Sequence, residues 1–311
     1  MSTGGIGRPW PSYLALAASM TLVGSYVALS KPLVAALPVF LLAGLRFGIA
    51  AVAMLPWTRR TPGEPPLSRR EHGQLFLMSF FGNFLFSICM LSGIALTTAT
   101  AAGVILATLP AAVALLARVV LGERFTPRVA WAVALAVGGI AALQFVRADA
   151  TETSRAQTLL GNLLLLGAVF CEATYVILSK RLAATRAPLR VSALINLWGL
   201  ALMAPLALWQ AQGFTFAAVT PPLWALLVFY ALAASLFAVW LWMSGMQRVP
   251  ANHAGVFTVA LPIAATLVGV GLLGEQFTWL HAAALAAAAA GVVLIATAPQ
   301  QRRTARPGPV E

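Results

Sequence analysis

The sequence predicts an all-α membrane protein of ten transmembrane helices, arranged as two inverted five-helix repeats with both termini in the cytoplasm. Three observations lead to this prediction: the composition, a long internal repeat and the distribution of lysine and arginine. Hydrophobic residues make up 60% of the 311 residues and charged residues only 9%, and the mean hydropathy is +0.89. Because a soluble domain carries roughly 25% charged residues, this chain has too little polar surface to face water.

The internal repeat relates residues 92–126 to residues 244–278 at a constant offset of 152, with 15 of the 35 positions identical. The identities include Ser-Gly at the start, Leu-Pro in the middle and Leu-Gly-Glu-x-Phe-Thr at the end. Chance similarity between two apolar helices matches mostly leucine and alanine, whereas glycine, proline and glutamate match here in register. We therefore infer an internal duplication.

Ten apolar runs are long enough to cross roughly 30 Å of hydrocarbon, which takes about 20 helical residues. They are residues 12–30, 37–57, 73–92, 97–120, 127–146, 158–180, 189–210, 222–243, 250–273 and 278–298. Among the joints between them we expect Ser30-Lys31-Pro32 and a turn at Ser92-Gly93. The predicted organisation is a first repeat over 1–146, a linker over 147–157, a second repeat over 158–298 and a disordered basic tail over 299–311.

The basic residues predict the orientation. Fifteen lysines and arginines lie on the side that carries the N-terminus, three lie on the other side, and Arg46 and Arg118 lie within spans. This asymmetry places both termini in the cytoplasm. The net charge of +12 then indicates topology and affinity for anionic lipid head groups, and not a nucleic-acid partner. Five spans per half is an odd number, so the second copy is inverted, as is typical of secondary transporters with a mid-membrane substrate site.

The ten spans and the repeated Gly-Val, Leu-Pro and Leu-Gly-Glu-x-Phe-Thr pattern make the chain similar to the drug/metabolite transporter superfamily, in its bacterial EamA-type branch. The resemblance covers nearly the whole chain. It implies export of small metabolites, often amino acids including aromatic ones, across the inner membrane; nucleosides, phosphorylated sugars and drugs are the alternative cargoes. It also implies a central cavity walled by the first, third, fourth, sixth, eighth and ninth spans. One departure is that Val23 and Glu172 stand where the family often has tryptophan.

Glu172 is the one carboxylate inside a predicted span. A charge at that depth costs something like 2.5–3.5 kcal/mol on insertion scales, so it should face a cavity or a partner. Helical spacing puts Glu172, Tyr175 and Ser179 on one stripe, and the repeat relates Tyr175 to Tyr26 at an offset of 149. We expect Glu172 either to couple proton movement or to contact a substrate amine. The alternative is a structural glutamate bonded to a polar neighbour such as Thr174 or Asn196.

Two further spans carry polar groups among aromatic rings, which would suit an amphipathic solute. Asn83 on the third span and Trp240 on the eighth are the candidate cavity residues, although such a stripe also fits contact with lipid or with another helix. Arg46 could bind a substrate carboxylate or pair with Glu172, but the family layout places the second span outside the cavity wall.

Pro110 and Pro262 lie near the middle of the fourth and ninth spans, where proline removes a backbone hydrogen bond. They are candidate hinges for alternating access, or fixed bends. Gly103 and Gly255 precede them and permit close helix approach. Small residues also recur in Ala134-x-x-x-Gly138 and Ala287-x-x-x-Gly291, which could join the repeats or form a homodimer.

Other functional classes find little support in the sequence. The chain has no Gly-x-Ser-x-Gly elbow, His-Glu-x-x-His, Walker-A or dinucleotide fingerprint, so we expect no enzyme, no cofactor and no metal site. An intramembrane enzyme would need Glu172, Ser179 and His253 to converge. A channel would need rings of charge or a filter-like loop. Without a nucleotide-binding loop, transport must draw on a gradient or on exchange.

Overall fold

The computed structural model describes residues 10–60, 63–121, 127–144, 152–182, 186–246 and 255–296, and in these residues it contains helices and turns but no strand. The helices are α1 (Trp10–Ala36), α2 (Val39–Ala53), α3 (Leu55–Thr58), α4 (Arg69–Ser79), η1 (Phe80–Leu85), α5 (Phe86–Ala95), α6 (Ala99–Leu106), α7 (Leu109–Leu121), α8 (Pro127–Gln144), α9 (Glu152–Leu182), α10 (Pro188–Ala211), η2 (Phe216–Ala218), α11 (Pro221–Leu232), η3 (Ala233–Phe237), α12 (Ala238–Met246), η4 (Gly255–Val259), α14 (Ala260–Gly271) and α15 (Trp279–Ala296). The prediction of an all-helical protein is confirmed. The C-terminal tail lies outside the described residues, and α9 begins within the segment expected to be a linker.

Within the part of the chain that the structure describes, six helical stretches are long and apolar enough to cross a membrane: Trp10–Ala36, Arg69–Leu96, Ala99–Leu116, Arg155–Ser179, Pro188–Ala211 and Pro221–Trp242. Four shorter apolar helices accompany them, at Val39–Ala53, Ala130–Gly139, Phe257–Gly271 and Trp279–Leu294. Each of these ten helices lies within or overlaps one of the apolar runs expected from the sequence.

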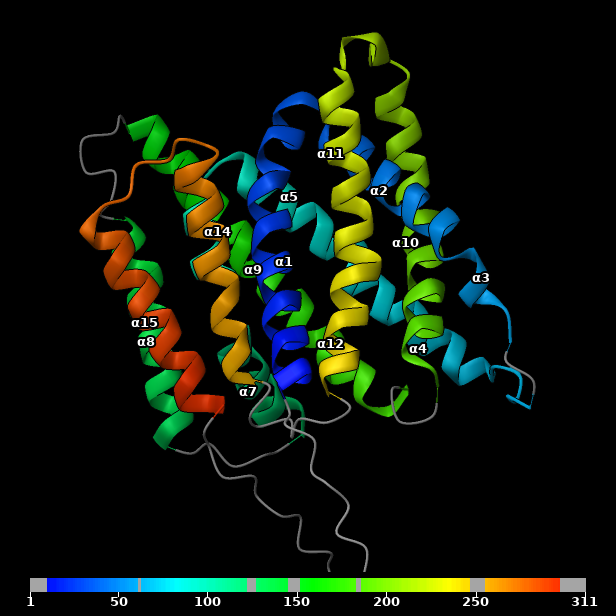
Figure 1. Ribbon diagram of the computed structural model, residues 1–311, viewed down its shortest axis with the longest axis horizontal. Coiled ribbons are helices and arrows are strands. Elements are labelled where there is room, and N and C mark those ends of the chain that lie inside the picture. The colour runs from blue at the N-terminus through cyan, green and yellow to red at the C-terminus, as the bar shows by residue number, and fades with distance from the viewer. Residues whose placement is uncertain are drawn as a thin grey trace, which may run out of the picture.

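The helices form a central group with a pair on either side (Figure 1). α1 packs against α12 and α14, and α9 packs against α5, α6 and α7. The first long helix of each half therefore contacts helices of the opposite half. α2 with α10 forms one outer pair, and α8 with α15 forms the other. The candidate residues of the central helices are thus enclosed by elements from both halves.

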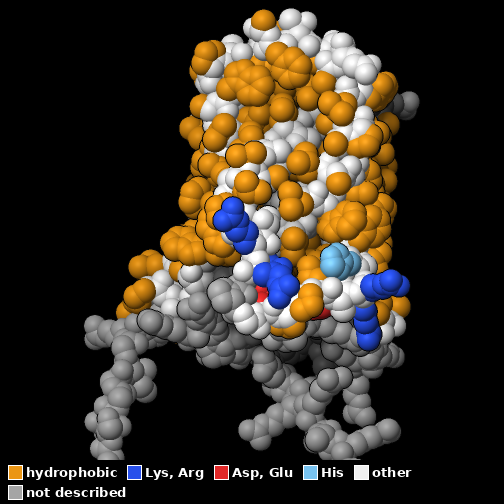
Figure 2. Space-filling view, turned by 90° about the vertical axis from the view of Figure 1, so that its right-hand side faces the viewer, with side chains coloured by type: hydrophobic (Ala, Val, Ile, Leu, Met, Phe, Trp, Pro, Cys, Tyr) orange, Lys and Arg blue, Asp and Glu red, His pale blue; other side chains and the backbone are white. Residues whose placement is uncertain are grey.

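The two ends of the described chain lie at the same end of the molecule, because α1 begins where α15 finishes (Figure 1). Lysine and arginine side chains gather toward that same end on the face shown in Figure 2, whereas the opposite end is mainly apolar there. Four arginines next to α3 and at the start of α4 are exposed: Arg59, Arg60, Arg69 and Arg70.

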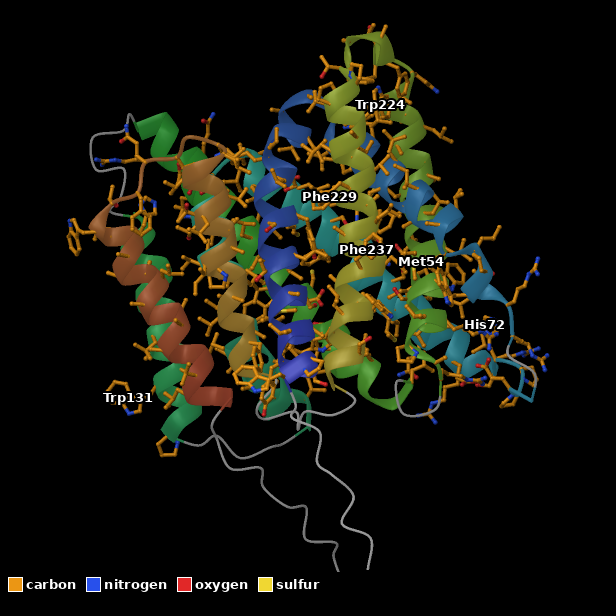
Figure 3. The ribbon with its side chains drawn as sticks, in the orientation of Figure 1. Met54, His72, Trp131, Trp224, Phe229 and Phe237 are labelled. Atoms are coloured by element: carbon orange, nitrogen blue, oxygen red, sulfur yellow. The ribbon has the colours of Figure 1, made fainter. Side chains whose placement is uncertain are left out.

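Large apolar side chains cover the outside of the helix pack. Trp131 projects away from α8 (Figure 3) and is 67% exposed. Phe229 and Phe237 are also exposed. A soluble monomer rarely exposes contiguous apolar surface on this scale, whereas a lipid-facing surface requires it.

Two joints expected from the sequence are absent. α1 continues through Pro32 to Ala36, with Leu33 completely buried. α5 continues through Ser92 and Gly93 to Ala95. A Cβ atom at Gly93 would lie 2.8 Å from Leu165 Cγ and 2.9 Å from the Gly161 carbonyl oxygen. The glycine is therefore explained by close contact with α9, and not by a turn.

The repeated Gly-Glu motif has a structural role in its second copy. Gly274 turns the chain with a φ of 68°, a conformation that favours glycine. Glu275 then accepts hydrogen bonds from the backbone nitrogens of Ala99 (2.6 Å) and Thr100 (3.0 Å), at the start of α6, and pairs with Lys31 Nζ at 3.1 Å. A carboxylate satisfies the free N–H groups of a helix start, so this contact joins the two halves. Its counterpart Glu123 lies outside the described residues.

The third and eighth spans share an irregularity that is also repeated. η1 and η3 are π-helical segments. In the repeat alignment, the offset of 152 makes Asn83 of η1 equivalent to Ser235 of η3. Single π-turns within α-helices are uncommon and occur often at functional sites. Their recurrence at equivalent positions extends the duplication beyond the identical residues.

Candidate functional site

Glu172 faces the interior of the helix pack. Leu165, Ala168 and Val169 of α9 are all buried, and helical spacing continues this stripe to Glu172. The carboxylate is half-buried. It forms no ion pair or hydrogen bond with another residue that the structure describes. In particular, the expected structural partner Thr174 donates instead to the Phe170 carbonyl at 2.8 Å.

Arg46 reaches the same interior from α2 and is only 7% exposed. Its Nη1 donates to Ser87 Oγ of α5 at 3.1 Å. Its guanidinium carbon lies 4.9 Å from the ring centroid of Phe47 and 5.6 Å from that of Tyr230. Such contacts over ring faces favour a cation. The buried Nε has no hydrogen-bond partner among the described residues.

Tyr26 and Tyr230 lie near these charged residues and contact each other. Their ring centroids lie 5.7 Å apart with an interplanar angle of 71°, an edge-to-face contact between α1 and α11. Arg46 acts electrostatically on both tyrosines and on Glu172, and Glu172 acts on Tyr26 and Tyr175. Tyr230 is fully buried, and its hydroxyl lies near Arg46 without a hydrogen bond of good geometry in the described part of the chain.

We call these five residues the interior cluster: Tyr26, Arg46, Glu172, Tyr175 and Tyr230. They come from α1, α2, α9 and α11, so both halves contribute. Its two charges are opposite, yet they do not approach within the 4.0 Å of an ion pair. A carboxylate and a guanidinium in one low-dielectric interior attract strongly, and neither has an ion-pair partner among the described residues.

Three further predicted site residues, Asn83, Ser179 and Trp240, lie outside the interior cluster, and Tyr175 of the cluster also contacts η1. Asn83 donates to the Ile195 carbonyl of α10 at 2.8 Å, and Ser179 donates to Val176 of its own helix at 2.9 Å. Trp240 is 51% exposed and faces outward. Tyr175 packs its ring against Gly82 of η1, where a Cβ atom would lie 2.7 Å from the ring.

The predicted hinge residues mark breaks in two helices. Pro110 is the second residue of α7, after a turn that ends α6. Pro262 follows the change from the 3-10 segment η4, which begins at Gly255, to α14. Proline is well tolerated at such a helix start, where its missing N–H is not needed. Gly103 packs against Pro262 and Ala265 of α14.

The described residues contain no group of three His, Cys, Asp or Glu side chains that could hold a metal ion. Cys89 and Cys171 are both free thiols. His253, which the enzymatic alternative requires, lies outside the described residues. The chemistry available in the interior cluster is therefore charge recognition, ring contact and proton exchange.

A profile of the EamA-like transporter family matches residues 10–144 and again residues 159–297. The chain belongs to the EamA-like transporter family. The uncharacterized transporter YetK of Bacillus subtilis (strain 168) is 34% identical over 282 residues, which are 90% of this chain and 85% of YetK. The uncharacterized transporter YwfM of the same organism is 31% identical over 145 residues, 47% of this chain and 48% of YwfM. A crystal structure with 21% identity shares the fold, with a TM-score of 0.61 over 92% of this chain and 97% of its own.

Membership in the EamA-like family confirms the resemblance inferred from the repeated motifs. The family and its relatives are transporters, which argues against an enzyme. Of the candidates named from the sequence, Glu172, Tyr26 and Tyr175 lie in the interior cluster; Arg46 had received little weight there and Tyr230 had not been singled out. The available signal for Arg46 was its rarity: it is an arginine in the middle of an apolar run, with no residue nearby in sequence to neutralise it.

Proposed function

We propose that this EamA-like protein is a secondary transporter that exports amino acids, in particular aromatic or other apolar ones, across the bacterial inner membrane. Family membership supports transport of small molecules through a membrane. The observation that carries the choice of substrate is the half-buried Glu172 carboxylate, which has no partner among the described residues. An intramembrane carboxylate without a partner is a candidate site for a cationic group.

In this proposal Glu172 binds the ammonium group of the substrate or carries the coupled proton. The rings of Tyr26 and Tyr175 lie in electrostatic reach of Glu172. They would provide an amphipathic wall with an apolar body and a polar tip, suited to an apolar side chain. Nucleosides, phosphorylated sugars and drugs remain the alternative cargoes. Nucleosides and phosphorylated sugars lack the ammonium group that this arrangement favours.

We infer a multi-pass topology of ten spans, with both termini in the cytoplasm and repeats over 1–146 and 158–298. The exchange of contacts between halves, in which α1 packs on α14 and α9 packs on α6 and α7, supports an inverted repeat. The two family matches, over residues 10–144 and 159–297, support the same division. The basic residues at the end that carries α1 and α15 support a cytoplasmic location for that end.

Alternating access would proceed by rocking of the two halves about the helix breaks before Pro110 and Pro262. A broken helix can change its angle with little loss of backbone hydrogen bonding. Gly103 lets α6 approach α14 closely beside Pro262, so a movement at the second break would act directly on α6.

Solute counterflow in liposomes tests this function. Purified protein would be reconstituted into liposomes that are loaded with unlabelled solute. Labelled phenylalanine, threonine, a nucleoside or a sugar phosphate would then be added outside, with and without a pH gradient. The proposal predicts saturable exchange of the amino acids that internal substrate accelerates. Exchange of the nucleoside or the sugar phosphate alone would contradict the assignment to amino acids. A modified product in place of the original solute would indicate an enzyme.

A further inference from the structure

We propose that Arg46 is a specificity-determining residue that binds the carboxylate of the substrate, while Glu172 of the same interior cluster binds its ammonium group. This inference rests on the proposed function and adds a second charged contact to it. It also adds the helix α2 to the proposed binding site. α2 packs mainly on α10 and α11 at the outside of the bundle, and the family resemblance places the second span outside the cavity wall.

The first argument is the missing counter-charge. Arg46 is 93% buried, and no carboxylate lies within 4.0 Å of it in the described part of the chain. Its bond to Ser87 Oγ is a contact with a neutral group. Removing a guanidinium from water costs several kcal/mol unless an anion compensates, and at membrane depth water is scarce. A substrate carboxylate would supply that anion.

The second argument comes from another buried arginine in the same chain. Arg186 is 9% exposed, but it has a complete set of partners. It donates to Glu71 at 2.9 and 3.1 Å, to Glu64 at 3.0 Å and to the carbonyls of Pro65 and Pro66 at 2.7 and 3.3 Å. This is how the fold satisfies a structural arginine. Arg190 is also buried and has an unpartnered Nε, but it pairs with Glu64. Arg46 differs because it pairs with no carboxylate among the described residues.

The third argument is the arrangement of those donors. Phe47 and Tyr230 contact the guanidinium and limit its orientation. Arg46 Nε is buried without a partner among the described residues. The buried Tyr230 hydroxyl lies near the Arg46 guanidinium but forms no hydrogen bond of good geometry in the described part of the chain. A guanidinium fork matches the two oxygens of a carboxylate, and the phenol can add a third donor. Tyr26 holds Tyr230 in place through their ring contact.

The fourth argument is that Glu172 and Arg46 lie in one cluster and both lack an ion-pair partner among the described residues. Glu172 and Arg46 interact electrostatically but form no ion pair. If they paired directly, each would satisfy the other and neither would need a ligand. A solute with an ammonium and a carboxylate group can bridge them, so that every charge in the interior is compensated when the site is filled.

Four probes with one phenyl ring separate the two contacts. Phenylalanine carries both charged groups, phenylalaninamide and phenethylamine carry only the amine, and 3-phenylpropionate carries only the carboxylate. Counterflow and protection against thermal unfolding would be measured for each probe with the wild type, Arg46→Gln, Arg46→Lys and Glu172→Gln. Arg70→Gln, at an exposed arginine, is the matched control for loss of one positive charge.

We expect the wild type to prefer phenylalanine over phenylalaninamide, and Arg46→Gln to reduce that preference roughly tenfold or more, because a site built to bind a polar group rejects analogues that lack it. Arg46→Lys should restore part of it, since the charge remains without the fork. Glu172→Gln should change the preference between phenylalanine and 3-phenylpropionate instead. Arg70→Gln should resemble the wild type.

If Arg46→Gln does not fold, Tyr230→Phe provides the second test, because it removes only the hydroxyl. It should weaken binding of both carboxylate probes while leaving phenethylamine unaffected.

A wild type that handles phenylalaninamide as well as phenylalanine would overturn the role of Arg46 and leave amine transport through Glu172 standing. Transport of 3-phenylpropionate but not phenylalanine would leave carboxylate binding by Arg46 standing and overturn amine binding by Glu172. Equal losses for all four probes in Arg46→Gln would make the residue merely structural. Folded wild type that exchanges neither carboxylate probe would also overturn the proposal.

Discussion

Replacing Glu275 by alanine should destabilise the protein by about 1–2.5 kcal/mol. The carboxylate accepts from Ala99 N, from Thr100 N and from Thr100 Oγ1 at 2.6, 3.0 and 2.9 Å. Hydrogen bonds to a charged group contribute about 1.5–3 kcal/mol each, but the loss of a helix cap costs about 0.5–2 kcal/mol in total. The ion pair with Lys31 adds about 0.5 kcal/mol, since that lysine is 32% exposed. Lys31→Met should therefore be much milder than Glu275→Ala.

The same contact has a defined pH dependence. Burial alone would raise the pKa of Glu275, but the hydrogen bonds from Thr100 and Ala99 and the charge of Lys31 lower it below the ordinary value of 4.5. A lowered folded-state pKa means that the contribution is fully present above about pH 4.5 and is lost as the pH falls through the folded-state value. Wild type should therefore lose its advantage over Glu275→Ala only in acid.

Thermal unfolding in detergent, followed by the intrinsic fluorescence of the nine tryptophans, measures this effect. This readout does not depend on thiolate reactivity, so it works in acid as well as at neutral pH. The melting temperatures of wild type, Glu275→Ala and Lys31→Met would be compared between pH 4 and pH 8. Equal melting temperatures for wild type and Glu275→Ala at neutral pH would refute the reasoning, and so would a difference that grows as the pH falls.

Three further changes should separate packing from transport. Gly24→Val should lower the melting temperature or prevent folding, because a Cβ there would overlap the Leu261 carbonyl oxygen, whereas Gly48→Ala, with open space around it, should not; a stable Gly24→Val would contradict the close contact of α1 with α14. Asn83→Ala should lower the unfolding free energy by about 1 kcal/mol through loss of the bond to Ile195, with unchanged substrate affinity in a binding assay; weaker affinity without destabilisation would return Asn83 to the site. Pro110→Ala and Pro262→Ala should slow counterflow more than they change half-saturating substrate concentrations, and unaltered rates in both would make the prolines fixed bends.

The architecture was predictable because the duplication preserved residues whose backbone or charge roles allow few substitutes. The matching Gly, Pro and Glu residues mark helix breaks, turns and a cap, and the structure shows the reason for several of them. Gly274 needs its positive φ, and Glu275 caps α6. Glu172 was predictable because a carboxylate in an apolar run has few explanations.

The limits arose where one residue type serves two purposes. The glycine of Ser92-Gly93 fits a turn as well as a helix contact, and the contact depends on α9, a helix far away in sequence. Helical spacing placed Asn83 and Trp240 on stripes but could not tell which side faces α10 and which faces outward. The surroundings of Arg46 depend on its contact with the ring of Tyr230. Tyr230 belongs to the other half of the chain, and the repeat offset does not relate it to Arg46.

Counterflow of labelled phenylalanine by wild type and Glu172→Gln, at matched amounts of folded protein in the liposomes, tests the central claim most directly. The account predicts rapid, saturable exchange by wild type and a loss of rate or of pH response in Glu172→Gln. Equal exchange rates and equal pH profiles for the two proteins would contradict it, because Glu172 would then neither bind the substrate nor carry a proton.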